Sequence, residues 1–257
     1  MRSRLVALRD ARAWLVAFLL LAVWPVAACA QDDADEPDLI RLPAVRLDGP
    51  VSVEEALSER RSIRNYRAET LTLDELGQVL WSAQGVTYPI EQTPEGFQWE
   101  WRGGFRTAPS AGALYPLELY VVVGHVDGLK SAVYRYVPVE HALRLAAPGD
   151  LRAPLSQAAH GQKVISTPPA VLVIAGVVAR TAAKYGERAE QYVLLEAGAA
   201  AENVFLQCES LGLATVFVGA FVDEEVKEVL HLPEEEEAYV LMPIGRRQPT
   251  GSSPPQP

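Results

Sequence analysis

The first part of the chain predicts two helices, each opened by a Ser or Thr with Glu three residues later. This capping box occurs at Ser52 and again at Thr72. After Thr72, apolar residues recur every three or four positions, which is the period of a helix with one buried face. The segment ends at Gly85, a residue type that favours helix termination. Its apolar stripe consists of Leu73, Leu76, Leu80 and Ala83.

The middle and the end of the chain carry short apolar runs with strand character. Two of these runs, 133–137 and 142–146, are separated by a short polar turn and predict a hairpin. A helix is expected after the hairpin at 151–160, and a further short helix is expected to open at Asp223. The other predicted strands are 117–124, 170–175, 214–218 and 238–242.

The longest predicted helix runs from about Ala189 to Leu211 and ends at Gly212. Its apolar and small residues cover more than one face, so we expect it to lie centrally or at a subunit interface. The small residues of 198–201 would let another helix approach closely. Together with the strands, this helix predicts an α+β sandwich in which one sheet is flanked by helices.

The N-terminus has the composition of a bacterial secretory signal. Arginines dominate residues 1–12, an uncharged apolar run covers 13–24, and small residues follow up to Ala30. This apolar stretch is shorter than the about 20 residues that usually span a membrane, and an uncleaved anchor is the alternative. The residues before Cys29 resemble the lipobox of bacterial lipoproteins, although cleavage after Ala30 fits the small-residue rule almost as well. We therefore expect a lipoprotein exported to the cell envelope, facing the periplasm or the cell exterior.

Composition divides the chain into four parts. Residues 1–28 are the expected signal peptide, and residues 29–50, rich in Asp and Pro, are expected to form an acidic tether. Residues 248–257 have the composition of a disordered tail. No repeat or linker interrupts 51–247, so this segment is expected to be one domain.

Charge and motif content exclude several classes of function. The chain has 23 Lys and Arg against 33 Asp and Glu, and its net charge of −10 leaves no general basic field for nucleic acid. It contains no Gly-x-Ser-x-Gly elbow, no Gly-Lys-Ser/Thr phosphate loop and no Gly-x-Gly-x-x-Gly motif. Its four histidines are scattered, so no metal site is predicted. Cys208 lies in an apolar helical stretch and is expected to be a buried structural thiol.

Two segments carry candidate binding chemistry. The first gathers three guanidinium groups and a hydroxyl within five residues of an otherwise acidic protein, at Arg60, Arg61, Ser62 and Arg64. Guanidinium groups bind phosphate oxygens in a bidentate way, so an anion site is predicted here, with a solvated basic surface as the alternative. The second segment, 106–116, is a run of small and apolar residues that leads into a strand. Its free backbone N–H groups would let a flat heteroaromatic ring lie close to the chain, and a simple tight loop is the alternative.

These segments resemble the nitroreductase family of flavoproteins, in particular its SagB-type oxidase branch. The resemblance spans 51–247, and further motifs follow in the same order along the chain. It implies an α+β sandwich with a mixed sheet flanked by helices, a homodimer, and FMN bound at the interface between the subunits. The further motifs are Leu73 to Leu76, Leu80 to Gly85, Lys184 to Gly186, Tyr192 to Gly198, Asn203, and Val218 to Phe221.

The resemblance also implies roles for individual residues. The arginine cluster (Arg60, Arg61, Ser62 and Arg64) should meet the phosphate end of FMN, and Arg246 or Arg247 should complete this clamp. Lys184 and Tyr185 match a Lys-Tyr pair implicated in proton removal, and their position between a strand and the long helix predicts a loop over the pocket. The residues expected along the isoalloxazine ring are Pro109, Ser110, Ala111 and Gly112 on one side, with Gly219 and Ala220 near N5.

The resemblance leaves the reaction open. SagB-type enzymes oxidise thiazolines and oxazolines in ribosomal peptides, whereas the wider family reduces quinones or nitroaromatics with NAD(P)H. A non-catalytic envelope protein that keeps the fold as a binding module is the alternative from another class. Ala199 stands where the family commonly has His, which is a departure from its pattern. The aromatic segment 97–102 lies in a region that varies within the family, and it would either line a substrate pocket or pack over the domain.

We predict that Cys29 is the acylated first residue of the mature protein. Mass spectrometry of the membrane fraction should then show a lipid-modified N-terminus at this residue. Cys29→Ala should release the protein from membranes, because the substitution removes the sulfur that carries the lipid. An unmodified N-terminus at Gln31 would indicate a soluble periplasmic protein instead.

Overall fold

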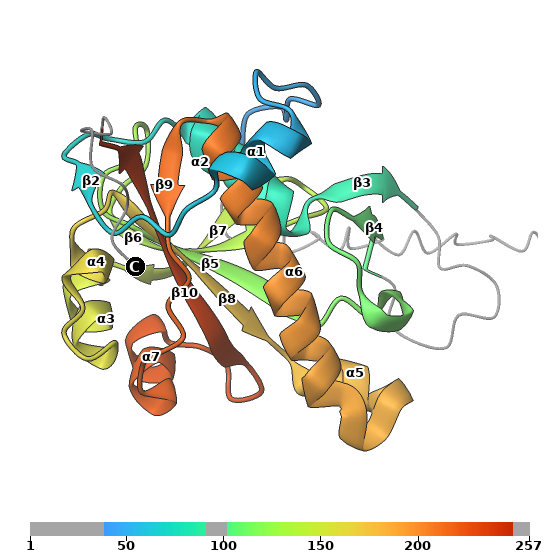
Figure 1. The fold of residues 1–257 in the computed structure, drawn as a ribbon. Helices are drawn as coiled ribbons and strands as arrows, with labels where there is room; N and C mark the ends of the chain where they lie inside the picture. The colour runs from blue at the N-terminus through green and yellow to red at the C-terminus, as the bar shows by residue number, and fades with distance from the viewer. Residues whose placement is uncertain (1–38, 91–101, 249–257) are drawn as a thin grey trace, which may run out of the picture. The chain divides into compact units, whose positions relative to one another are not determined.

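The computed structural model describes residues 39–90 and 102–248, which form one sheet with helices on both of its faces (Figure 1). The eight-stranded sheet runs in the order β1-β7-β6-β5-β8-β10-β2, with β9 paired to β10, while β3 and β4 form a separate two-stranded sheet. The strands are β1 (Ile40–Arg41), β2 (Tyr66–Arg67), β3 (Val86–Pro89), β4 (Gly104–Arg106), β5 (Leu117–Val123), β6 (Ala132–Val137), β7 (Ala142–Pro148), β8 (Ala170–Gly176), β9 (Leu213–Thr215) and β10 (Glu237–Arg247). The α-helices are α1 (Val53–Glu59), α2 (Leu73–Gln84), α3 (Arg152–Ala158), α4 (Lys163–Ser166), α5 (Val178–Tyr185), α6 (Ala189–Ser210) and α7 (Asp223–Leu230).

The central strands β5 and β8 are buried on both faces, which explains their nearly unbroken apolar sequences. Successive side chains of a strand point to opposite faces of its sheet. On β5, Leu119 and Val121 therefore enter one hydrophobic core, whereas Tyr120 and Val122 enter the other. The sheet thus separates two cores, as expected for a sandwich.

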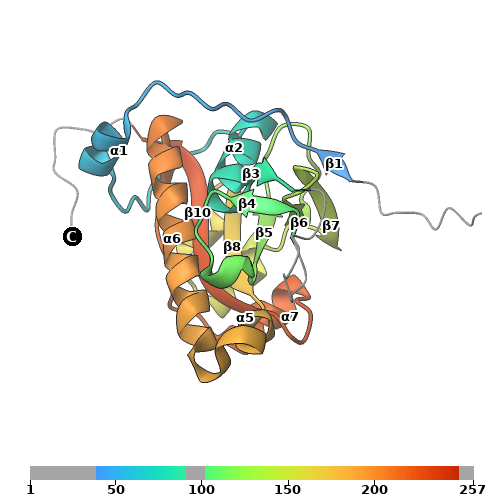
Figure 2. The ribbon, with the colours of Figure 1, turned by 90° about the vertical axis from the view of Figure 1, so that its right-hand side faces the viewer.

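Different helices close the two cores. Helices α2 and α6 pack on one face, where Leu80 and Val204 join the first core. Helices α3, α4 and α7 cover the other face, where Leu155 and Val226 join the second. The two views show α6 and α7 on opposite sides of the sheet (Figures 1 and 2). This arrangement confirms the predicted α+β sandwich.

Both pairing directions occur in the structure. The ladders between the named strands are antiparallel, including the long β5–β8 and β8–β10 pairs. An isolated parallel bridge joins Leu71 to Val126. The hairpin predicted from 133–137 and 142–146 is present as β6 and β7.

Helix ends follow the predicted local signals. Thr72 forms a complete capping box with Glu75, and Ser52 accepts a hydrogen bond from the Glu55 backbone N–H. Gly212, just beyond α6, has a φ of 66°, a conformation that glycine adopts at little cost. Hydrogen bonds between residues close in sequence therefore fix where these helices begin, independently of how the helices pack on the sheet.

Three boundaries differ from the expectation. Ile40–Arg41 forms β1 and pairs with β7, although these residues were assigned to the acidic tether. The strand expected at 214–218 ends at Thr215, and only a bridge from Val218 to Leu241 continues the pairing. The last strand, β10, extends to Arg247 instead of ending at 242, because β2 and β9 pair with its far end.

Several of the sequence predictions fall outside the described residues. They concern the signal peptide with Cys29 in the lipobox, all but the last residue of the aromatic segment 97–102, and the tail beyond residue 248. Within the described ranges, none of the helices has the length and apolar character needed to cross a membrane. Cys208 is buried as predicted, and burial raises the pKa of its thiol.

Leu172→Ala should lower the free energy of unfolding by about 2–5 kcal/mol, because Leu172 is fully buried on β8 and its truncation leaves a cavity. Leu145→Ala is the matched control, since this leucine on β7 is 54% exposed, and its effect should stay within about 0.5 kcal/mol. Urea unfolding of both variants and the parent measures the two differences. Equal destabilisation by the two substitutions would contradict the central position of β8.

Candidate functional site

The loop between β4 and β5 is held in an uncommon backbone conformation. Gly112, Ala113 and Tyr115 have positive φ angles of 64°, 55° and 45°. This region costs a residue with a side chain about 1–2 kcal/mol. The Ser110 Oγ accepts a hydrogen bond from the Tyr115 N–H at 2.9 Å, and the Tyr115 hydroxyl accepts one from the Arg106 N–H at 3.2 Å. The loop is thus held in place by hydrogen bonds at both of its ends, and strain of this kind is typical of binding sites.

Gly112 marks a close approach between this loop and helix α5. A Cβ atom at Gly112 would lie 2.9 Å from both Lys184 Nζ and the Tyr185 hydroxyl oxygen, so a larger residue would force these side chains to move. The Tyr185 ring packs edge-on against Tyr192 of α6, with 4.9 Å between ring centroids. The structure therefore brings the predicted Lys-Tyr pair to the predicted ring-binding loop.

The pair differs from the expectation in its local structure. Lys184 and Tyr185 occupy the last turn of α5, whereas a loop was predicted for this segment. Both side chains reach toward Gly112 from this last helical turn. Lys184 is exposed to solvent, and Tyr185 is half-buried.

A groove of about 300 Å³ runs between the loop and helix α6. Pro109, Ser110 and Ala111 form its loop side. Its helix side is formed by Tyr192, Leu195, Glu196 and Ala199. Ala199, which departs from the family pattern, thus lines this groove, where the small side chain leaves space.

The arginine cluster lies directly after α1 and reaches the other half of α6. The Arg60 guanidinium stacks over the Phe205 ring at 5.1 Å and approaches the Glu202 carboxylate at 3.9 Å. Arg61 donates to two backbone carbonyls, those of Ser58 and Arg60. The Ile63 N–H donates to the Thr215 carbonyl at 2.9 Å, which fixes the backbone of the cluster to β9.

The two arginines at the end of β10 are engaged elsewhere. Arg246 pairs with Glu75 and approaches Glu69 at 3.8 Å, and Arg247 pairs with Glu209 at 2.6 Å. Among the described residues, none of these ion pairs joins the two arginines to the arginine cluster.

Gly219 and Ala220 lie on an exposed turn between β9 and α7. A Cβ at Gly219 would meet only Phe217, at 3.5 Å, so a flat group could approach this backbone closely. The Ala220 carbonyl accepts a hydrogen bond from Gln162 at 2.9 Å. No contact found in the described ranges joins this turn to the 109–112 loop.

Two of the predicted groups therefore lie at separate points along α6. The 109–112 loop meets the helix at Glu196, and the arginine cluster meets it at Phe205, nine positions later. At 1.5 Å per residue this separation is about 13 Å. The two halves of the predicted site lie at different levels of one helix.

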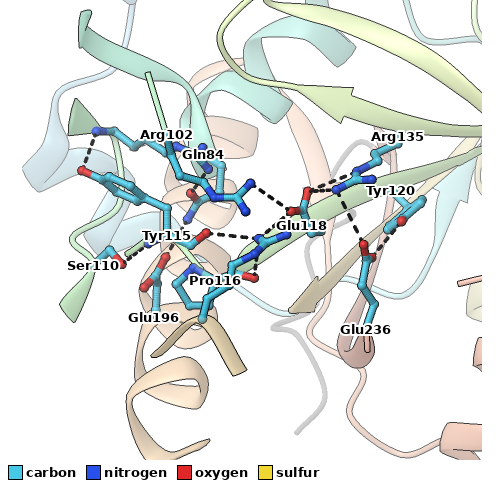
Figure 3. A network of polar contacts seen from close by, with 12 residues as sticks. Gln84, Arg102, Ser110, Tyr115, Pro116, Glu118, Tyr120, Arg135, Glu196 and Glu236 are labelled. Carbon is cyan, nitrogen blue, oxygen red and sulfur yellow. Dashed lines mark hydrogen bonds and ion pairs between the residues drawn. The ribbon is translucent and has the colours of Figure 1, made fainter. Parts of the chain in front are cut away.

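A polar network around the buried carboxylate of Glu118 lies beside Tyr115 at the end of the loop (Figure 3). Glu118 at the start of β5 pairs with Arg180 at 2.6 Å, Arg135 at 2.8 Å and Arg102 at 3.8 Å. Burial alone would raise the pKa of Glu118, but the guanidinium groups of Arg135 and Arg180 hold it below the usual value. Arg180 also donates to the carbonyl of Tyr115 at 3.4 Å, which ties the end of the loop to this network.

Two buried carboxylates at the candidate site were not singled out from the sequence. Glu118 is a lone charge in an apolar strand, and Glu196 is a carboxylate in the buried part of α6; both are less than 10% exposed. A charged residue within a run that is predicted to be buried is a signal that could have identified each of them.

The arginine cluster and the 109–112 loop each have the chemistry that one end of FMN requires. Ser62 and Arg64 are exposed and make no hydrogen bond or ion pair with other described residues, so their donors are available to phosphate oxygens. At the other end, small residues and a shallow groove admit a flat ring. No cluster of three or more His, Cys, Asp or Glu that could hold a metal ion occurs within 39–90 and 102–248.

Two known proteins are similar to this chain in amino-acid sequence. A Methanocaldococcus jannaschii protein, MJ1384, which is named as a nitroreductase, is 41% identical over 208 residues, covering 81% of this chain and 96% of the relative. McbC of Escherichia coli, a microcin B17-processing protein, is 24% identical over 142 residues, covering 53% of this chain and 52% of its own.

Solved structures and the family match agree with these relatives. A crystal structure of a protein described as a nitroreductase from Ralstonia eutropha JMP134 superposes with a TM-score of 0.67 at 30% identity, covering 82% of this chain and 90% of that one. A chain of the E. coli microcin synthetase McbBCD complex shares the fold with a TM-score of 0.59 at 18% identity, covering 88% and 84%. The model of the nitroreductase family matches residues 57–246. The chain belongs to the nitroreductase family.

Proposed function

We propose that this protein is an FMN-dependent oxidoreductase of the SagB-type branch, which moves hydride between FMN and a small organic or peptide-derived substrate. The observation that carries the proposal is the approach of Lys184 and Tyr185 to Gly112 in the loop expected along the flavin ring. Two groups that can exchange protons thus stand beside that loop. The sequence similarity to McbC, named for the processing of microcin B17, supports the branch.

In this proposal the arginine cluster holds the phosphate group and the 109–112 loop lies along the ring. Bound FMN supplies two-electron redox chemistry at its N5 atom. The hydrogen bond from Ile63 to Thr215 holds the backbone of the cluster in place. The entropy cost of ordering this backbone is therefore met on folding and not on FMN binding. Arg246 or Arg247 would join the clamp by exchanging its carboxylate partner for phosphate, and Gly219 and Ala220 would face the ring near N5.

Lys184 and Tyr185 handle the proton in this proposal. A substrate that gives up hydride must also lose a proton, and the site needs a group to take it. The Lys184 Nζ lies 5.4 Å from the Tyr185 ring centroid, and the Tyr185 ring is itself packed against Tyr192. This packing orients the phenol so that it can donate or relay a proton at the loop.

A second candidate is an NAD(P)H-dependent nitro or quinone reductase. The 41% identity to MJ1384, which carries a nitroreductase name, favours it. Mixing the FMN-loaded protein with each candidate reductant under anaerobic conditions separates the two proposals. The flavin of a reductase would be reduced by NAD(P)H, whereas the flavin of a SagB-type oxidase would be reduced by its organic substrate. A purified protein that binds no FMN would favour a non-catalytic binding module over both.

A homodimer would join the two halves of the site. The arginine cluster and the 109–112 loop lie about 13 Å apart along α6, so a second copy packed on this helix could bring complementary halves together. Apolar residues are exposed on α6 and on the neighbouring α1, and a patch of this kind often marks an interface. These residues are Leu194 (49% exposed), Leu195 (69%), Val53 (63%) and Leu57 (54%).

Export to the cell envelope with a lipid on Cys29 is part of the same proposal. The order of charged, apolar and small residues before Cys29 supports it. No twin-arginine pair occurs in residues 1–12, so export as an unfolded chain is expected. The exported enzyme would then have to acquire its FMN outside the cytoplasm.

Replacing both Arg61 and Arg64 by Ala should weaken FMN binding by roughly 1.5–3 kcal/mol for each charged hydrogen bond lost. Quenching of FMN fluorescence measures the dissociation constant. Arg41→Ala, an exposed arginine on β1, is the control and should bind as the parent does. A double variant with the affinity of the parent would refute the phosphate assignment.

Lys184→Ala and Tyr185→Phe should slow flavin reduction by substrate by roughly 10²- to 10⁴-fold, the usual contribution of general acid–base catalysis. Stopped-flow measurement under anaerobic conditions gives the rate, and FMN content must match the parent. Lys163→Ala, an exposed lysine on α4, serves as the control. Rates within a few-fold of the parent in both variants would remove this pair from the mechanism.

Leu194→Glu should convert the dimer to a monomer, because it places a charge in the exposed apolar surface of α6. Light scattering after size exclusion measures the mass of parent and variant. Leu145→Glu, similarly exposed on β7, should leave the dimer intact. A monomeric parent would contradict the proposed dimer.

A further inference from the structure

A cavity of about 340 Å³ lies beside the start of β5 and the turn that joins β6 to β7. Among the described residues it shares no lining side chain with the groove at α6. Small-molecule sites in proteins usually measure about 300–1,000 Å³, so this volume suits a small ligand. The charged residues of its wall are Arg102, Arg106, Glu118, Arg135, Glu140 and Arg144.

Positive charge exceeds negative charge around this cavity. Four arginines line it against two glutamates, although the chain as a whole carries a net charge of −10. Of the two glutamates, Glu140 is exposed, so solvent screens its charge. Glu118 is buried, and its single charge is already shared among the guanidinium groups of Arg102, Arg135 and Arg180. The carboxylates of the described residues therefore leave positive charge at the cavity uncompensated.

Two of the arginines lie directly opposite each other on neighbouring strands. Arg135 of β6 and Arg144 of β7 are partners in the register of the antiparallel ladder. Like charges at such a pair of positions are destabilising. Arg135 is compensated by Glu118, whereas no carboxylate of the described residues forms an ion pair with Arg144. The fold thus keeps an unfavourable pair of positive charges at the wall of the cavity.

Two guanidinium groups at the cavity have a donor without a partner. The Nε atoms of Arg106 and Arg144 are shielded from solvent and make no hydrogen bond within the described part of the chain. A buried donor without an acceptor is unfavourable, and an acceptor that reaches it removes this cost. A guanidinium group also stays protonated near neutral pH, so its charge is not lost by titration as the charge of a buried carboxyl group can be.

The same cavity already shows how a guanidinium group binds a carboxylate there. Arg135 contacts Glu118 Oε2 through both its Nε, at 3.1 Å, and its Nη2, at 2.8 Å (Figure 3). Charge-assisted hydrogen bonds of this kind are among the stronger ones in proteins. In Arg106 and Arg144 the corresponding Nε edge is unpaired. Residues 136–139 add an apolar wall, which suits the hydrocarbon part of a ligand.

We propose that this cavity binds the carboxylate groups of a small organic acid, with Arg106 and Arg144 as its binding residues. The excess positive charge and the unpaired Nε donors require an anion, and the volume and the apolar wall favour a small organic one. Both side chains border the cavity, so a small rotation turns their donors to a ligand within it. Because two guanidinium groups have an unpaired Nε, a dicarboxylate matches the site better than a monocarboxylate.

The cavity adjoins the end of the 109–112 loop through Arg106. The Arg106 N–H donates to the Tyr115 hydroxyl at 3.2 Å, and its guanidinium lies 4.7 Å from the centroid of the Tyr115 ring. An organic acid held by Arg106 would therefore bind one residue away from this loop. Its binding needs no flavin, so it can be measured whether or not the protein binds FMN.

Isothermal titration calorimetry with succinate tests the proposal, and succinamide serves as the uncharged analogue of similar size. The parent should bind succinate and not succinamide. Arg144→Gln and Arg106→Gln should each weaken succinate binding by roughly tenfold to a hundredfold, the equivalent of one charged hydrogen bond. Arg41→Gln, which removes an exposed arginine of β1, is the matched control and should bind succinate as the parent does.

Thermal unfolding separates a binding role of Arg144 from a structural one. Without ligand, Arg144→Gln should unfold at the temperature of the parent or above it, because the substitution removes a positive charge opposite Arg135. Succinate should raise the unfolding temperature of the parent but not that of Arg144→Gln, since only a protein that binds it is stabilised. A variant that unfolds at a lower temperature than the parent without ligand would contradict the role given to Arg144.

Three binding results would overturn the proposal. One is a parent that does not bind succinate, or that binds succinamide equally well. Another is unchanged succinate affinity in both Arg144→Gln and Arg106→Gln. The third is tighter binding of inorganic phosphate than of succinate, which would assign the cavity to a different class of anion.

Discussion

Helix α6 has to be buried along one side, because the residues on that side are apolar or small over its whole length. Val193, Ala197, Ala200 and Val204 are all 2% exposed or less and pack in the core beneath the helix. Their burial fixes the rotation of the helix about its axis, since only one stripe of a helix can face the sheet. The Lys-Tyr pair, the 109–112 loop and the arginine cluster each meet a different part of this helix.

The position of α6 thereby sets the spacing of the site. The aromatic ring of Tyr192 packs against Tyr185, Glu196 lines a groove together with Ser110, and Phe205 stacks against Arg60 of the arginine cluster. A rigid helix keeps these contacts at constant separations, which a series of loops could not do. The apolar residues that remain exposed on α6 favour a second copy of the chain as the partner that completes the site.

The two buried carboxylates of the site illustrate two ways of meeting the cost of burial. Glu118 shares its charge among three guanidinium groups, and this keeps it ionised and rigid beneath the loop. Glu196 lacks such a partner among the described residues, so its protonation state is sensitive to its surroundings. The first arrangement supplies a fixed support for the loop, and the second leaves a carboxyl group with a raised pKa beside the groove.

The sequence by itself determined the features that depend on interactions between residues close to one another along the chain. Capping boxes fix where α1 and α2 begin, the alternation of residues identifies β6 and β7, and the apolar run of α6 predicts its central position. The arginine cluster and the 109–112 loop could be recognised because their residue types are unusual for the positions where they occur. These signals lie within a few residues of one another along the chain.

Only the tertiary structure decided which of these segments meet. Periodicity could not show that Lys184 and Tyr185 close a helix, or that Ile40–Arg41 adds a strand to β7, because each depends on a neighbour distant in sequence. Nor could it show that Arg246 and Arg247 are paired with carboxylates, or that Glu196 and Ser110 line the same groove. Burial and charge pairing are properties of a residue's surroundings in space, and those surroundings exist only once the sheet and α6 have packed together.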